Sequence, residues 1–126
     1  MKQRFFICRH CGNMMTLVHD AGVPVECCGE PMEELVANTV EASAEKHIPF
    51  ITQEGSLVKV QVGEVEHPMV AAHFIQWICL ETNQGTQIKY LNAGEKPYAE
   101  FSLLPGETVD AVYEYCNVHG LWKKEM

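Results

Sequence analysis

The sequence is poor in positive charge and has no long hydrophobic run. Its 126 residues hold nine Lys and Arg against seventeen Asp and Glu, a formal net charge of -8, with no basic cluster. This balance repels a phosphate backbone, so we expect no nucleic-acid partner. No apolar stretch approaches the ~20 residues that a membrane-spanning helix needs, so we expect no membrane partner. The apolar run at residues 5–7 is far shorter than the ~7–15 residues of a signal-peptide core, which predicts a cytoplasmic protein.

Helix signals are also scarce. The region 41–45 contains Ala and Glu but is too short to form a helix alone. Apolar runs separated by turn residues predict strands at 57–62, 73–80, 86–91, 98–103 and 108–115. Their spacing is typical of an antiparallel, immunoglobulin-like β-sandwich of roughly seven short strands, so the predicted fold class is all-β.

A small, polar stretch at residues 37–44 divides the chain, and we interpret it as a linker. The preceding 36 residues combine glycines and prolines with short apolar pieces. A unit below ~40 residues usually needs a metal, disulfides or a partner chain to fold. We therefore expect a small metal domain at residues 1–36 and a β-sandwich domain at residues 37–126.

Four of the six cysteines lie within residues 8–28. Cys8 and Cys11 form a Cys-x-x-Cys knuckle, and the neighbours Cys27 and Cys28 supply a second pair for one tetrahedral centre. Because adjacent side chains diverge in an extended strand, the chain must turn sharply there, and Gly29 favours such a turn. In a reducing cytoplasm, metal binding is favoured over disulfides. Four thiolates select zinc or iron, and the spacing alone does not separate these two metals.

Histidines dominate the later part of the chain. His47, His67 and His73 lie near Pro residues or at a predicted strand end, and Cys116 and His119 form a Cys-x-x-His pair. The loop ends of a sandwich are places where side chains converge on a site. Four imidazoles and one thiolate would leave one position open at an octahedral metal. An open position indicates a reactive site, and iron suits a mixed nitrogen and sulfur set.

These paired motifs, in this order, resemble desulfoferrodoxin, the two-iron superoxide reductase family, over essentially the whole chain. The resemblance implies a small rubredoxin- or desulforedoxin-like domain with a distorted Fe(Cys)4 centre. It also implies an immunoglobulin-like domain in which four equatorial histidines and an axial cysteine bind the second iron. The implied ligands are Cys8, Cys11, Cys27 and Cys28 for the first iron, and His47, His67, His73, His119 and Cys116 for the second.

The resemblance further implies reduction of superoxide to hydrogen peroxide without release of dioxygen. Rubredoxin or a similar protein would be the electron donor, and the chain would form a homodimer. Lys46 would attract superoxide and assist protonation, and Glu45 would bind the oxidised iron when substrate is absent. From the turn geometry we also expect the Val118 amide to point toward the Cys116 sulfur and weaken its donation to the metal.

Two other interpretations remain open at this stage. A cupredoxin-like electron carrier could use the Cys-x-x-His pair, one upstream histidine and Met126 as an axial ligand, but it leaves two upstream histidines unexplained. A zinc-ribbon binding module fused to a sandwich would hold zinc in both sites. Cys79, His10 and His19 have no role in any of these interpretations.

Overall fold

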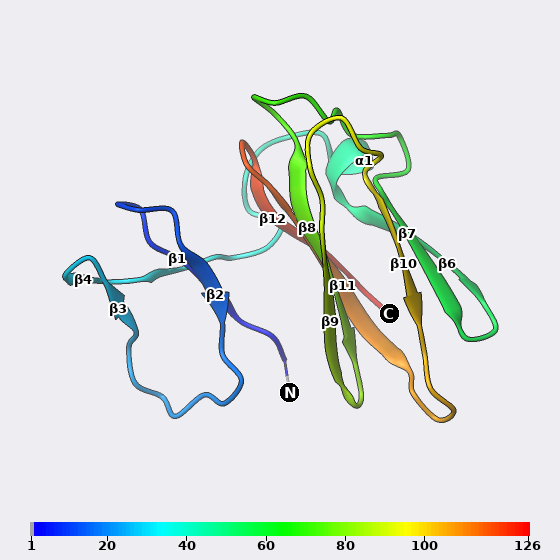
Figure 1. The fold of residues 1–126 in the computed structure, drawn as a ribbon, viewed down its shortest axis with the longest axis horizontal. Coiled ribbons are helices and arrows are strands. Elements are labelled where there is room, and N and C mark those ends of the chain that lie inside the picture. Colours follow the sequence, from blue (N-terminus) through cyan, green and yellow to red (C-terminus); the bar gives the residue numbers. More distant parts are fainter. Residues whose placement is uncertain (1) are drawn as a thin grey trace. The chain divides into compact units, whose positions relative to one another are not determined.

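The computed structural model describes residues 2–126, which contain twelve strands and one short helix. The predicted all-β class is therefore confirmed. The chain separates into two compact units, Met1–Val36 and Ala37–Met126 (Figure 1). No helix in the described part of the chain is long and apolar enough to cross a membrane.

The N-terminal unit is built from very short strands. They are β1 (Phe5–Ile7), β2 (Met14–Thr16), β3 (Glu26–Cys27), β4 (Glu30–Pro31) and β5 (Glu33–Glu34). Antiparallel pairing forms one sheet in the order β2-β1-β5 and a separate β3-β4 hairpin. Only β1 is buried along its whole length. Outside it, the Arg4 guanidinium lies 5.1 Å from the centre of the Phe6 ring and pairs with Glu34 and Asp20.

The C-terminal unit is a sandwich of two antiparallel sheets. Its elements are α1 (Ala44–His47), β6 (Pro49–Glu54), β7 (Leu57–Val62), β8 (Ile75–Thr82), β9 (Gly85–Tyr90), β10 (Tyr98–Ser102), β11 (Val109–Cys116) and β12 (Gly120–Glu125). One sheet has the order β10-β7-β6 and the other β12-β11-β8-β9. The five predicted strands are present within two residues at each end. His73, however, does not open a strand as predicted, because β8 begins at Ile75 and His73 lies in the preceding loop.

Side chains from both sheets fill the space between them. Residues of β7 alternate strictly between buried and half-buried, as expected for a strand with one face on the core. The shared cluster contains Val58, Val60, Val62, Ile75, Ile78, Leu80, Ala99, Phe101, Leu103, Val112 and Cys116. Cys116 thus belongs to the core, although it ends the strand β11.

Helix α1 is a single turn that the sequence did not predict. The amide of Val65 donates a hydrogen bond of 2.9 Å to the Glu45 carbonyl, which fixes the turn to the loop after β7. Gly63 makes this contact possible, because a Cβ there would lie 2.6 Å from the Glu45 oxygen and 2.9 Å from the Ile48 oxygen. Backbone therefore packs directly on backbone beneath His47.

Candidate metal centres

The four N-terminal cysteines converge as predicted, with their sulfurs all within 4.8 Å of one another. Cys8 follows β1, and its amide and carbonyl close the knuckle through bonds of 2.8 Å to Asn13 and Gly12. The predicted sharp turn is also present, because Cys28 and Gly29 have consecutive positive φ angles of 54° and 78°. A left-handed conformation is rare for residues other than glycine. At Cys28 it lets the side chains of Cys27 and Cys28 point to one centre although the residues are adjacent.

Protonation differs among these thiols. Hydrogen bonding, first from the Cys11 amide, lowers the pKa of Cys8 to about 6. The neighbouring thiols, first Cys8 and then Cys11, raise the pKa of Cys28 to about 12. The thiols of Cys11 and Cys8 likewise raise the pKa of Cys27. Four crowded sulfurs cannot all be anionic without a cation, so the cluster fits a metal that takes thiolate ligands and releases protons on binding.

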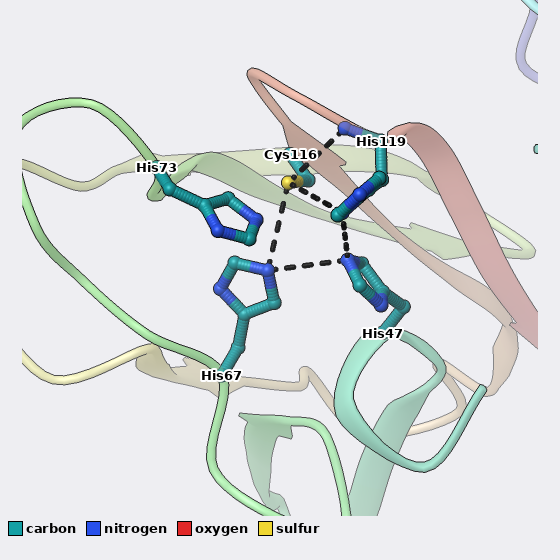
Figure 2. Close-up of side chains that lie close together, drawn as sticks. All are labelled: His47, His67, His73, Cys116 and His119. Atoms are coloured by element: carbon teal, nitrogen blue, oxygen red, sulfur yellow. Dashed lines mark hydrogen bonds between the residues drawn. The ribbon is translucent and has the colours of Figure 1, made fainter. Parts of the chain in front are cut away.

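The second cluster joins five residues from distant parts of the C-terminal unit (Figure 2). His47 ends α1, His67 and His73 lie in the connection between β7 and β8, Cys116 ends β11, and His119 lies in the following turn. The five donor atoms all lie within 4.8 Å of one another. This convergence confirms the grouping that the sequence predicted.

The shortest separations show which ring nitrogens face the centre. The Nε2 atom of His47 lies 3.2 Å from Nε2 of His67 and 3.1 Å from Nδ1 of His119. The Cys116 sulfur lies 3.5 Å from Nε2 of His67 and 4.0 Å from Nδ1 of His119. Nitrogen and sulfur atoms at these separations are close enough to be ligands of one cation placed between them.

Hydrogen bonds on the far side of two rings orient their nitrogens. Nδ1 of His47 lies 2.7 Å from the Ser43 carbonyl, and Nδ1 of His67 lies 2.6 Å from the Pro68 carbonyl. A carbonyl only accepts, so Nδ1 carries the proton and the Nε2 lone pair faces the centre. Nε2 of His73 is buried and has no hydrogen-bond partner. A bound metal would satisfy this nitrogen, so the residues present fit a metal.

Electrostatics favour the protonation states that bind metals. Desolvation, with smaller contributions from neighbouring histidines, lowers the pKa of His67 to about 4 and also lowers that of His47. Burial raises the pKa of Cys116, and the amides of His119 and Val118 oppose this shift. The His119 amide nitrogen lies 3.3 Å from the sulfur. The hydrogen bond to the Cys116 sulfur thus comes from the His119 amide, and the Val118 amide makes only a smaller contribution to the pKa. The imidazoles of His47 and His67 are neutral at pH 7.

The other predicted residues have different environments. Lys46 and Glu45 are exposed on α1, directly before His47. Cys79 is fully buried and belongs to neither cluster within the described residues, and desolvation raises its pKa to about 12. His10 pairs with Glu30 at 3.1 Å and also stands outside the cysteine cluster.

Sequence reasoning missed Trp122, which contacts two residues of the second cluster, and the buried acid Glu114. Trp122 stacks on the His47 ring with centroids 4.9 Å apart and donates a 3.1 Å hydrogen bond to the His119 carbonyl. Glu114 is fully buried beside the core, and neither of its carboxylate oxygens has a partner. Its burial raises the pKa well above the ordinary value. The position of Trp122 three residues after His119 was the only available signal, and it did not indicate stacking on His47.

The fold and the donor sets define an all-β protein whose two clusters match two iron centres, one with four cysteines and one with four histidines and a cysteine. The family model for desulfoferrodoxin matches residues 39–125. A desulfoferrodoxin of Syntrophotalea carbinolica is 44% identical over 124 residues, covering 98% of this chain and 97% of that protein. This chain belongs to the desulfoferrodoxin family.

Solved structures agree with this assignment. The chain is similar to the crystal structure of the superoxide reductase from Treponema pallidum, with a TM-score of 0.84 and 37% identity. That match covers 99% of this chain and 100% of the other. A superoxide reductase from Giardia intestinalis, described as a one-iron form, matches 65% of this chain and 97% of its own length, with a TM-score of 0.56 and 31% identity.

Proposed function

We propose that this protein is a superoxide reductase that converts superoxide to hydrogen peroxide and thereby removes a toxic oxidant. The observation that carries this proposal is the cluster of four imidazoles and one thiol with converging donor atoms. Ferrous iron bound by this cluster would supply one electron, which together with two protons converts one superoxide into one hydrogen peroxide. Five protein donors leave one octahedral position for the substrate.

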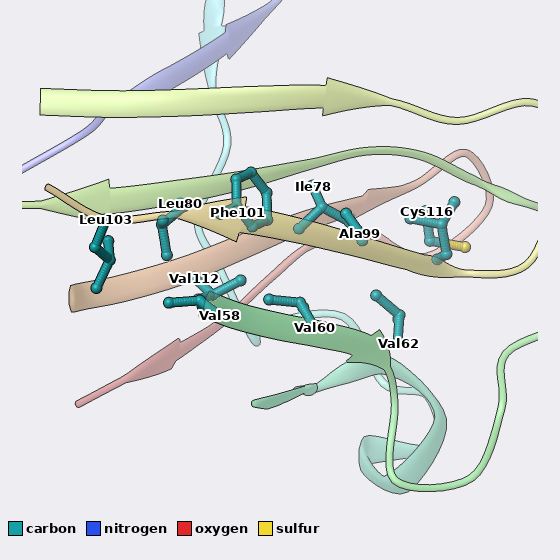
Figure 3. Packing of buried hydrophobic residues seen from close by; sticks show 11 residues of the cluster. Val58, Val60, Val62, Ile78, Leu80, Ala99, Phe101, Leu103, Val112 and Cys116 are labelled. Carbon is teal, nitrogen blue, oxygen red and sulfur yellow. The ribbon is translucent and has the colours of Figure 1, made fainter. Parts of the chain in front are cut away.

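Burial indicates the side from which superoxide would arrive. Cys116 is fully buried at one end of the core cluster (Figure 3), and His47 and His67 are also buried. His73 and His119 are half-buried. His73 and His119 are thus the donor residues whose side chains reach the surface. In our proposal, the core would keep water from the thiolate, and superoxide would approach from the side of His73 and His119.

Lys46 and Glu45, exposed directly before His47, are the proposed catalytic residues. At physiological ionic strength, charges farther away than ~8 Å are largely screened, so a local cation outweighs the net charge of -8. Lys46 precedes His47 on an exposed turn, where its ammonium group can attract an anion and supply a proton. In our proposal, the Glu45 carboxylate would bind the oxidised metal when substrate is absent.

The proposal extends to the N-terminal cluster and to partners. Cys8, Cys11, Cys27 and Cys28 would bind the second iron in a domain of residues 1–36, and the sandwich of residues 37–126 would bind the catalytic iron. Rubredoxin or a similar protein would return the electron, and the chain would act as a cytoplasmic homodimer. Support comes from the free thiols, which suit a reducing compartment.

Anaerobic metal analysis combined with pulse radiolysis of the reduced protein tests this function. We expect two irons per chain and rapid loss of superoxide absorbance with one peroxide formed per superoxide consumed. Copper in the histidine cluster would favour the electron-carrier alternative, which uses only one upstream histidine. Zinc in both clusters with no superoxide consumption would favour the binding module. Slow consumption by a fully ferrous sample would refute the proposal.

Lys46→Ile tests the role of the lysine, and Lys89→Ile on strand β9 is the matched control. Each variant changes the net charge from -8 to -9, so both alter the long-range field equally. We expect Lys46→Ile to slow superoxide capture about tenfold, at the low end of electrostatic steering effects, and Lys89→Ile to leave it unchanged. The difference should shrink as salt is added. Equal rates for the two variants would remove Lys46 from this role.

A further inference from the structure

Asn117 joins the two loops that carry three of the five donors. Its amide donates a 3.2 Å hydrogen bond to the Phe74 carbonyl, and its side-chain Oδ1 accepts a 2.9 Å bond from the Phe74 amide. Its Nδ2 donates a 3.1 Å bond to the Ala72 carbonyl. These three bonds bracket His73, which lies between Ala72 and Phe74. Asn117 itself follows Cys116, so one residue links His73 to the Cys-x-x-His turn.

His73 depends on this link more than His47 and His67 do. The far-side Nδ1 atoms of His47 and His67 are held by backbone carbonyls, whereas the His73 ring has no hydrogen bond to any described residue. His73 enters the centre from a loop rather than a strand (Figure 2). Its backbone pairs with Val70 alone, through bonds of 2.9 and 3.1 Å in an isolated bridge. Outer contacts of this kind set the orientation of a metal ligand.

We propose that Asn117 is a positioning residue that holds His73 against Cys116 and His119 in the geometry for metal binding. This inference rests on the proposed use of the cluster as an iron site and does not depend on the reaction with superoxide. Without the side chain of Asn117, the loop around His73 loses two of its three bonds to the Cys-x-x-His turn. His73 would then be the first ligand to leave the metal.

The opposite end of β8 provides a matched control. Asn83 donates from its amide to the Thr108 carbonyl at 3.1 Å and accepts from the Thr108 amide at Oδ1 at 2.9 Å. Its Nδ2 donates to the Gly106 carbonyl at 3.2 Å. Both asparagines are exposed, and their three bonds follow the same pattern. Asn83 is separated from the metal cluster by the eight residues of β8, about 25 Å of extended chain.

The test compares Asn117→Ala with Asn83→Ala in the full-length, iron-loaded protein. Both variants lose the same two side-chain bonds, so we expect similar losses in unfolding temperature. Transfer of the histidine-bound iron to a chelator should be at least tenfold faster in Asn117→Ala and within about twofold of the parent in Asn83→Ala. Iron in the four-cysteine cluster, followed by its own absorption, is the internal reference and should be unaffected.

A second measurement is specific to His73. In the ferrous protein, the shifted proton resonances of the His73 ring should move in Asn117→Ala, whereas those of His47 and His67 should stay. If Asn117→Ala does not retain iron, Asn117→Asp keeps the acceptor for the Phe74 amide and should show an intermediate rate of iron loss. Equal rates in the Asn117 and Asn83 variants, or equal movement of all the histidine resonances, would overturn the inference. None of these measurements uses superoxide, so they stand apart from the test of the reductase function.

Discussion

The contact beneath His47 predicts that one methyl group will disturb the histidine cluster. A Cβ at residue 63 would lie 2.6 Å from the Glu45 oxygen, 0.8 Å short of the 3.4 Å at which ordinary contact begins. The obstructing atoms are backbone, so in Gly63→Ala the whole turn that holds His47 must retreat. Metal-ligand distances tolerate changes of only about 0.2 Å. We therefore expect iron affinity to fall about 10- to 100-fold, with overpacking destabilising the fold by about 1–3 kcal/mol.

Iron transfer to a chelator, the visible spectrum of the oxidised protein and denaturant unfolding measure these effects. Gly55→Ala is the control, because residue 55 has a φ of +60° and an added methyl group there would have no atom within 4 Å. It should cost about 1–2 kcal/mol through backbone strain and leave the iron unchanged. If Gly63→Ala keeps the parent iron affinity and spectrum, the turn is not held by this contact and the reasoning is wrong.

Three further predictions address other parts of the molecule. Trp122→Phe keeps an aromatic ring against His47 and should lower the free energy of unfolding by about 1 kcal/mol, because the hydrogen bond to the His119 carbonyl is lost. Trp122→Leu should in addition release iron faster to a chelator. Equal rates of iron release in the two variants would argue against stacking as a support for His47. The raised pKa values of Cys27 and Cys28 keep both thiols protonated at pH 7, so metal binding by the cysteine cluster should release at least two protons. A calorimetric titration measures this release, with the variant that carries serine at both positions as the control. Hydrogen bonds, first from the Thr82 hydroxyl and then from the Leu104 amide, lower the pKa of Glu107 below 4.5. The ionised carboxylate therefore stabilises the folded protein above pH 4.5, and this contribution is lost as the pH falls through the lowered pKa. Glu107→Gln should therefore be less stable than the parent at about pH 7 but not at about pH 3 in urea unfolding, and a deficit independent of pH would contradict this sign.

The fold was predictable where side chains alternate along a strand. The three valines of β7 and their half-buried neighbours carry a period of two, so this strand is visible in the sequence. Strand β6 is largely exposed after its first residue, and β12 ends in Lys-Lys-Glu, so neither shows the alternation that prediction needs. Both form because their backbones complete the ladders of β7 and β11. The sequence does not encode such pairing in its side-chain pattern.

The donors were predictable for a related reason. Cys and His are rare and chemically distinct, so their spacing is informative even when the segments that carry them lie far apart in the chain. The residues that support them are not distinct in this way. Gly63 and Asn117 are ordinary turn residues, and only the three-dimensional structure shows that one admits a backbone contact and the other bridges two loops.

The metal-binding residues of the histidine cluster are held in place in two different ways. His47, His67 and His73 lie outside the regular strands. Backbone carbonyls of Ser43 and Pro68 hold the first two, and the two neighbours of His73 bond to Asn117. Cys116 alone ends a central strand and is packed in the core. The thiol is thus the rigid reference point, and the imidazoles are brought to it by loops. Changes in the core should therefore act on the site mainly through Cys116, whereas changes in the loops should act on one histidine at a time.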